Sequence, residues 1–137
     1  MKSVHDLVKG ARKVQQTILL VGDISDIYVT NFNTMMGDPN FTVEELSAIA
    51  FGYNRLFEES SNLLLDLKEV TTATGLSMTD KERLDIINRI YGEVLEYKNL
   101  TWYYTRKNIG ISYLRSKKKG DSQRVLALYG THEQRYW

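Results

Sequence analysis

Apolar and polar residues repeat with a helical period along three long stretches of the chain. In residues 42–74 the apolar side chains recur mostly at three- and four-residue steps, and at about 100° per residue they fall within an arc of about 160°. Polar side chains take the opposite face, with Phe51 and Leu65 as the exceptions. This pattern predicts one amphipathic helix that faces one core.

Residues 79–115 are apolar over a wider part of the helix surface. Two neighbouring stripes together cover about 220°, and only a narrow strip stays polar. A helix with so wide an apolar arc contacts more than one neighbour. We favour contact with both other long helices and with the short C-terminal segment. The alternative is that part of the arc binds another chain.

Residues 3–36 carry one apolar stripe, which widens over residues 17–27. Gly22 interrupts it at a cost of about 1 kcal/mol relative to alanine, which indicates a kink or a close helix crossing. The helix begins almost at residue 1, with Ser3 as the only evident cap. This abrupt start is typical of a fragment of a longer helical protein.

Two turns separate the three stretches. Each follows a glycine, Gly37 or Gly75, and each leads into a helix-start signal. Thr42–Glu45 and Thr79–Glu82 fit capping boxes, in which the threonine hydroxyl accepts from the backbone N–H three residues on. The single proline, Pro39, lies in the first turn.

A short fourth segment follows a break at Lys117–Gly120. We expect it to start at Asp121, as the N-cap, and to end at Gly130. Stretches of similar length joined by short turns favour an antiparallel bundle, and at about 1.5 Å per residue each long helix spans roughly 50 Å. The prediction is an all-α fold, an elongated antiparallel three-helix bundle with a short C-terminal helix. It forms a single helical domain over residues 1–137, with helices at about 3–36, 42–74, 79–115 and 121–129.

The composition is typical of a folded domain and excludes several kinds of functional site. The chain has 137 residues, of which 42% are hydrophobic and 26% charged. It has no cysteine, which excludes a disulfide scaffold, a thiol nucleophile and a cysteine-ligated metal. No apolar run approaches the roughly 20 residues that span a bilayer, so we expect no transmembrane segment.

The formal net charge of +1 hides an asymmetry between the two halves of the chain. Residues 1–70 carry a net charge of −4 and residues 71–137 a net charge of +5. Within residues 98–124, eight basic groups stand against one acid. Such a basic end can bind nucleic acid, contact an acidic partner or remain solvated surface. As the candidate partner surface we take Tyr103, Arg106, Lys107, Arg115, Lys117, Lys118 and Lys119.

The aromatic run Trp102–Tyr104 lies beside two of these cations. Consecutive helical residues point about 100° apart, so the three rings cannot form one flat platform for stacked bases. Tyr103 alone points toward the polar strip, whereas Trp102 and Tyr104 fall in the apolar stripes. Core packing explains this run best, a protein interface comes next, and nucleic acid is the weakest interpretation.

The search for catalytic or metal-binding residues is mostly negative. His5 and His132 lie near opposite ends of the chain, and neither has partners at metal-ligand spacing. Asp23 and Asp26 fit solvated helix charges better than a pair for acid–base catalysis. No phosphate-binding glycine loop or nucleophile elbow is present. We therefore expect a non-enzymatic protein with no cofactor, no metal and no catalytic residue.

Four phrases of the sequence resemble one family when taken together. They are Ala11–Ile18, Gly75–Ile87, Tyr103–Arg115 and Val125–Gly130. They resemble the TraI-type conjugal transfer proteins of Bacteroidetes conjugative transposons, a family distantly similar to the TrbJ-like minor pilus components of type IV secretion. The resemblance spans nearly the whole chain but includes no catalytic signature, and it does not concern the relaxase that shares the TraI name.

The resemblance implies a place and a role. It implies a signal peptide and a further N-terminal segment in the full-length protein, with export to the periplasm or cell envelope. It also implies a structural role in the mating channel or pilus, with other proteins of the conjugation machinery as partners. Self-association of the chain is a further possibility that we keep open. The competing hypothesis is a cytoplasmic helical adaptor or nucleic-acid-binding accessory factor that uses the basic C-terminal end.

Overall fold

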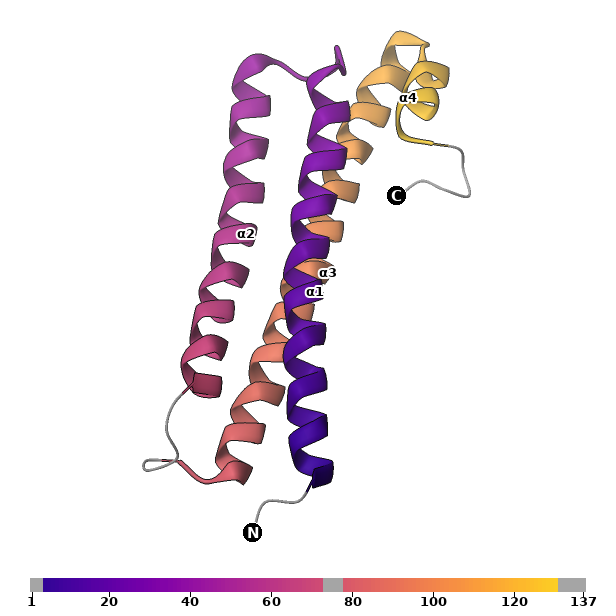
Figure 1. Cartoon of the computed structure of the whole chain (residues 1–137). Coiled ribbons are helices and arrows are strands. Elements are labelled where there is room, and N and C mark those ends of the chain that lie inside the picture. The colour runs from indigo at the N-terminus through magenta and orange to yellow at the C-terminus, as the bar shows by residue number, and fades with distance from the viewer. Residues whose placement is uncertain (1–3, 73–77, 131–137) are drawn as a thin grey trace.

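The computed structural model describes residues 4–72 and 78–130, which form four α-helices and no strand. The helices are α1 (Val4–Met36), α2 (Val43–Thr72), α3 (Asp80–Lys119) and α4 (Ser122–Tyr129). The three long helices run side by side, with α2 antiparallel to the other two (Figure 1). The predicted all-α bundle with a short C-terminal helix is confirmed.

One helix end differs from the prediction, because α3 continues to Lys119 instead of ending near residue 115. Lysine is a good helix former, and cations in the last turn interact favourably with the partial negative charge of the helix end. Gly120 ends the helix with φ 77°, a conformation that glycine adopts without steric cost. Lys117, Lys118 and Lys119 therefore belong to the last turn and not to a break.

The start of α2 has the predicted cap. Glu45 N donates to Thr42 Oγ1 at 3.1 Å, and Thr42 N donates to Glu45 Oε1 at 2.9 Å, which completes the capping box at the start of α2. At the start of α3, Glu82 N donates to Thr79 Oγ1 at 3.1 Å. The turn that the sequence places after Gly75 lies largely outside the described residues.

The start and end of α4 fall where the sequence placed them, but one detail differs. Asp121 occupies the N-cap position, yet its side chain makes no capping hydrogen bond. Instead the Asp121 carboxylate accepts from Arg124 Nη2 at 2.7 Å. Gly130 ends the helix, and its N–H donates to Leu126 O at 2.9 Å.

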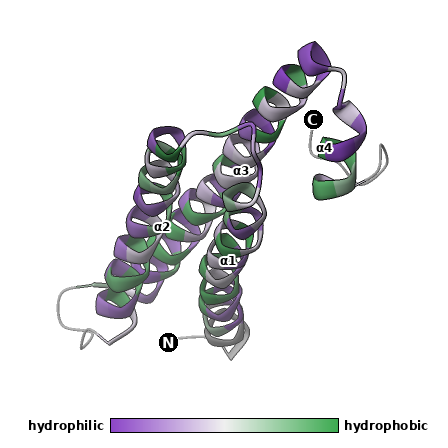
Figure 2. Cartoon of the chain, turned by 90° about the horizontal axis from the view of Figure 1, so that it is seen from above, coloured by the Kyte–Doolittle hydropathy of each residue, from purple (hydrophilic) through white to green (hydrophobic). Residues whose placement is uncertain are grey.

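Two clusters of buried apolar side chains hold the bundle together. The lower core joins α1, α2 and α3, and consists of Leu20, Val21, Ile24, Leu67, Ile87, Ile90 and Val94. The upper core adds the α1–α2 loop and α4, and consists of Met35, Phe41, Ile49, Tyr53, Ile109, Val125 and Tyr129. Seen from above, α3 extends past the other long helices and α4 packs back beside its end (Figure 2).

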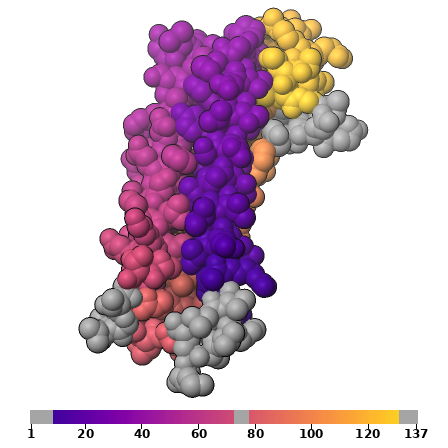
Figure 3. Space-filling model, viewed as in Figure 1, coloured from indigo at the N-terminus to yellow at the C-terminus, as the bar shows by residue number. Residues whose placement is uncertain are grey.

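The wide apolar arc of α3 is used within the chain, since α3 packs against α1, α2 and α4. On α2, Phe51 and Leu65 are 66% and 60% exposed, as the pattern predicted. On α1, the helical period places Ile18 on the apolar stripe, yet Ile18 is 50% exposed, because it lies where α1 and α2 meet at the surface. Figure 3 shows α1 and α2 side by side on one face of the molecule, with α4 at one end.

Candidate partner surface at the end of α3

Five of the seven candidate partner residues share one face of α3. At about 100° per residue they fall within an arc of about 120°, opposite the buried side of the helix, and they extend over about 22 Å. All five are exposed, and Tyr103 shows 57% of its surface to solvent. We call this set the outward basic face, and it consists of Tyr103, Arg106, Lys107, Lys117 and Lys118.

The cations of this face differ from the other basic groups of residues 98–124. Lys98 Nζ binds Asp23 Oδ2 at 3.1 Å, and Arg124 binds Asp121. By contrast, no described acid forms an ion pair with Arg106, Lys107, Lys117 or Lys118. The outward basic face therefore presents uncompensated positive charge beside one exposed aromatic ring.

Arg115 is half-buried and differs from these five residues in that it binds other parts of the chain. Its guanidinium donates to both carboxylate oxygens of Glu45, at 2.8 and 2.6 Å, and to Asn40 O at 2.8 Å. This two-pronged pairing suits the planar guanidinium. The hydrogen bond from Arg115, assisted by the one from Thr42, lowers the pKa of Glu45 to about 2. Arg115 thus fastens α3 to the start of α2.

Lys119 also contacts the α1–α2 loop, although its side chain is exposed. Its Nζ donates to Asn40 Oδ1 at 3.0 Å. Lys119 and Arg115 lie about 40° apart on the helix, on the side that faces the loop. The two side chains therefore position the end of α3, and the residues free to meet a partner are those of the outward basic face.

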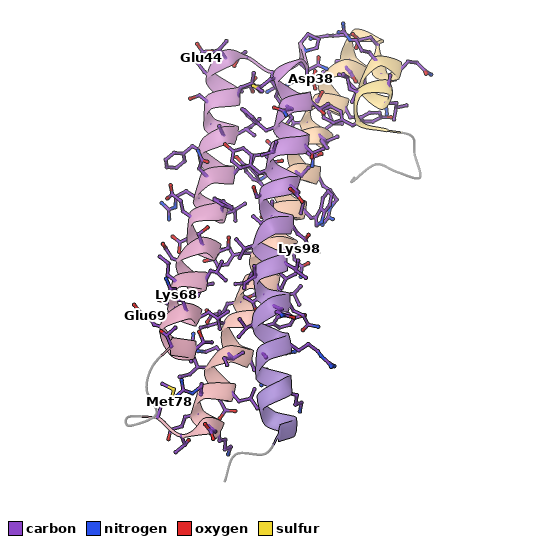
Figure 4. The ribbon with its side chains drawn as sticks, in the orientation of Figure 1. Asp38, Glu44, Lys68, Glu69, Met78 and Lys98 are labelled. Carbon is purple, nitrogen blue, oxygen red and sulfur yellow. The ribbon has the colours of Figure 1, made fainter. Side chains whose placement is uncertain are left out.

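A buried carboxylate completes this junction. Asp38 is 2% exposed and lies in the α1–α2 loop at the upper end of the molecule (Figure 4). It accepts hydrogen bonds from Ser112 Oγ, from Tyr129 OH at 2.8 Å and from Asn40 N at 2.9 Å. Burial and the bond to Asp38 raise the pKa of Tyr129 well above its ordinary value. One side chain thus joins the loop, α3 and α4.

Asp38 did not emerge from the sequence search. The signal that could have found it is the segment Gly37-Asp38-Pro39-Asn40, because an aspartate before proline often bonds the backbone two residues on. That local bond is present, from Asn40 N. The longer-range bonds to Ser112 and Tyr129 have no such local signal.

Aromatic packing fixes α3 against α2 just below this junction. Tyr28 stacks on Tyr53 with ring centroids 4.8 Å apart, and Tyr104 meets Tyr53 edge-on at 5.0 Å. Tyr53 OH and Thr105 Oγ1 share a hydrogen bond of 2.6 Å, and burial raises the pKa of Tyr53 to about 12. Tyr104, next to the exposed Tyr103, is thus held on the inner side of α3.

The described residues contain no group of three or more His, Cys, Asp or Glu side chains that could hold a metal ion. His132 and the side chain of His5 lie outside the described part of the structure. Asp23 is bound to Lys98, and Asp26 is exposed. Within residues 4–72 and 78–130, no helix has the length and hydropathy of a membrane span.

Comparison with known proteins gives no relative for this chain. No family model, curated protein or solved structure matches it. The geometry of the outward basic face and the resemblance of the sequence phrases are therefore the two grounds for a functional proposal.

Proposed function

We propose that this protein is a non-enzymatic structural component of a conjugative transfer apparatus, similar to type IV secretion, which acts through protein–protein contacts in the periplasm or cell envelope. The observation that carries the proposal is the outward basic face of α3. Its four cations lack ion-pair partners in the described structure, and Tyr103 is exposed among them. Complementary charge guides association, and exposed tyrosine is enriched at protein interfaces.

The support beneath this face suits a docking role. Arg115 and Lys119 bind the α1–α2 loop, and Asp38 links that loop to Ser112 on the inner side of α3. A surface that is already rigid loses less conformational entropy on binding than a mobile segment does. The partner that fits this face is an acidic protein surface of the same apparatus.

The assignment to conjugation comes from the resemblance of the four sequence phrases, which implies export and a role in the mating channel or pilus. Fractionation of cells that carry the full-length gene tests the location. We expect the protein in the periplasmic or envelope fraction. Recovery in the cytoplasmic fraction alone would contradict this location and favour a cytoplasmic adaptor.

Charge reversal tests the outward basic face. We expect the combined variant Lys117→Glu and Lys118→Glu to lower the frequency of conjugation and to leave the helical circular dichroism unchanged. The matched control is Arg12→Glu with Lys81→Glu, which reverses two exposed cations elsewhere. Equal conjugation frequencies in the two variants would remove the face from consideration.

A DNA gel shift separates a protein partner from the nucleic-acid alternative, since both would use the same cations. Phosphate contacts by these cations would give binding at low salt that weakens steeply as salt is added. We expect no shift at low salt. A salt-sensitive shift that Lys117→Glu abolishes would favour the nucleic-acid-binding accessory factor instead.

A further inference from the structure

The exposed side of α3 carries four charged residues at equal spacing. Asp85, Glu96, Lys107 and Lys118 follow one another at steps of 11 residues, and all four are exposed. Eleven residues make close to three helical turns, so these side chains share one line along the helix. Two acids come first and two cations follow, and no described residue forms an ion pair with any of the four. The outward basic face therefore continues into an acidic lower half of α3.

Exposed apolar side chains lie on the same line. Leu100 is 46% exposed, Tyr103 57% and Leu114 61%, and they are the exposed large hydrophobic residues of α3. At about 100° per residue, these three and the four charged residues fall within an arc of about 60°. We call this line of seven residues, from Asp85 to Lys118, the α3 strip. Its middle is apolar, since Leu100 and Tyr103 lie between the acids and the cations.

The α3 strip is complementary to itself when its direction is reversed. In two antiparallel α3 helices related by a two-fold axis, residues at equal distances from the axis lie level with each other. With the axis between residues 101 and 102, Glu96 faces Lys107 and Asp85 faces Lys118. Leu100 lies level with Tyr103 at the centre. A parallel pair in register would place like charges together, so the order of charges selects the antiparallel direction.

Two further charges within the same arc are compatible with this pairing. Arg89 binds Glu93 Oε1 at 3.0 Å, so its charge is already compensated. It lies level with Leu114 of the other copy, which the aliphatic part of the arginine can cover. Glu82, at the start of α3, lies within one turn of the level of the copy's Lys118 and adds to its attraction.

Three exposed cations lie just outside the arc. Arg106 and Lys117 belong to the outward basic face, and in the antiparallel pair they lie beside the acidic lower half of the other copy. Lys81 lies at the start of α3, four residues beyond the level of the copy's Lys118, so these two cations do not face each other.

An acidic groove of about 550 Å³ borders the lower half of the strip, between α2 and α3. Four carboxylates line it, from Glu59, Asp66, Glu93 and Glu96. Two of them pair with an arginine of their own helix, Glu59 with Arg55 and Glu93 with Arg89, whereas no described residue forms an ion pair with the other two. Because Lys107 of the second copy faces Glu96, its long side chain reaches the mouth of this groove.

We infer that the acidic surface which the outward basic face meets is a second copy of this chain. The α3 helices of the two copies lie antiparallel, with the two-fold axis between residues 101 and 102. A partner of different sequence would have to carry two carboxylates 11 residues apart beside an apolar centre, and the lower half of α3 already supplies this arrangement. The inference rests on the proposed function, because it names the partner of that same face.

Sedimentation equilibrium of the full chain measures the association. We expect a dimer with a dissociation constant in the micromolar range, which weakens as salt is added. Leu100→Glu should associate at least tenfold more weakly, since it places two carboxylates in the apolar centre. The matched control is Leu65→Glu, because Leu65 is 60% exposed on α2 and lies outside the strip. A wild type that stays monomeric at high micromolar concentration would overturn the inference.

Exchange of charges tests the register of the two helices. Glu96→Lys and Lys107→Glu each place like charges opposite one another on both sides of the axis, so each variant should dimerise at least tenfold more weakly with unchanged circular dichroism. The two substitutions combined in one chain restore opposite charges, and association should return toward that of wild type. A combined variant no stronger than the single ones contradicts the proposed axis. Glu58→Lys, which reverses an exposed acid of α2 outside the groove, is the control.

Conjugation assays on the same variants separate this inference from the proposed function. Glu96→Lys changes no residue of the outward basic face, yet it should lower the frequency of conjugation together with dimerisation. If the wild type is monomeric and the reversal of Lys117 and Lys118 still lowers the frequency, the second copy is excluded and the face binds another protein. If the dimer forms and neither change affects the frequency, the dimer stands and the role of the face in conjugation is excluded.

Discussion

The two ends of the bundle are held together by different means. The lower core consists of aliphatic side chains from three helices, and its contacts depend little on direction. The upper end combines an apolar cluster with directional bonds: the Asp38 carboxylate and the Arg115–Glu45 pair join segments that lie far apart in the chain. The lower end therefore depends mainly on burial, with Arg83 Nη1 donating to Val70 O as one directional contact between α3 and α2. At the upper end the bonds also fix the position of the outward basic face.

This contrast predicts that truncation in the lower core has the largest effect on stability. Leu67 is 1% exposed, so Leu67→Ala removes buried methyl groups and leaves a cavity. We expect a loss of about 3 kcal/mol in the free energy of unfolding, measured by urea denaturation. Leu65→Ala, at an exposed neighbouring position, is the control. Similar losses for the two variants would contradict the assignment of Leu67 to the core.

Removal of the buried carboxylate tests the upper end. Asp38→Ala leaves the donors of Ser112, Tyr129 and Asn40 without their acceptor, at a cost of about 2 kcal/mol. Amide hydrogen exchange provides the sharper measurement, because α4 should lose protection while the lower half of α1 keeps it. Equal loss along α1 and α4 would mean that Asp38 supports the whole bundle and not one end.

A glycine substitution compares how tightly the two ends are packed. A Cβ at Gly52 would collide with the Tyr104 hydroxyl, so Gly52→Ala should displace the ring and break its bond to Ile49 O, which is now 3.1 Å long. We expect a net loss of about 1 kcal/mol, since overpacking outweighs the gain in helix propensity. Gly92→Ala on α3 is the control, because nothing lies within 4 Å of its Cβ position. Gly92→Ala should leave the free energy of unfolding unchanged or raise it slightly. If Gly52→Ala had the same effect on the free energy of unfolding, Tyr104 would be able to move aside freely.

The smallest expected effect is a pH dependence that comes from Glu45. The hydrogen bond from Arg115 lowers the pKa of Glu45 from 4.5 to about 2 in the folded protein. Because the pKa of Glu45 is lower in the folded state, ionised Glu45 stabilises the folded protein at pH values above 4.5, the pKa of the unfolded state. This contribution is lost as the pH falls from 4.5 toward 2. Urea denaturation of wild type and Glu45→Gln at pH 7 and pH 3 measures it. The difference between the two proteins should shrink at pH 3 and in high salt.

The sequence predicted those parts of the fold that depend on neighbouring residues. Thr42 and Glu45 are three residues apart, so the capping box and the start of α2 were visible in the pattern. The bond between Arg115 and Glu45 joins residues 70 apart, and it depends on how far α3 extends and how it is rotated. No periodicity contains that information. Arg115 therefore appeared to be one more exposed cation.

The exposure of Ile18 is hidden from the sequence for a related reason. A helical period indicates which residues lie on one stripe, but it does not show how closely the next helix approaches the edge of that stripe. Ile18 lies at this edge, where the surfaces of α1 and α2 diverge and leave a groove open. For the same reason, the helical pattern predicted that Tyr103 points outward. It did not predict that Arg115 and Lys119, unlike the other five candidates, bind the α1–α2 loop.

The Asp38 carboxylate also has a consequence for the order of folding. Its partners Ser112 and Tyr129 lie 74 and 91 residues further along the chain. Closure of loops this long is entropically costly and slow compared with formation of a helix. During synthesis, α1 and α2 can pair long before Tyr129 has been added, and until then Asp38 is hydrated in an open loop. The upper end is therefore completed last, and the outward basic face reaches its final support only when nearly the whole described chain has been made.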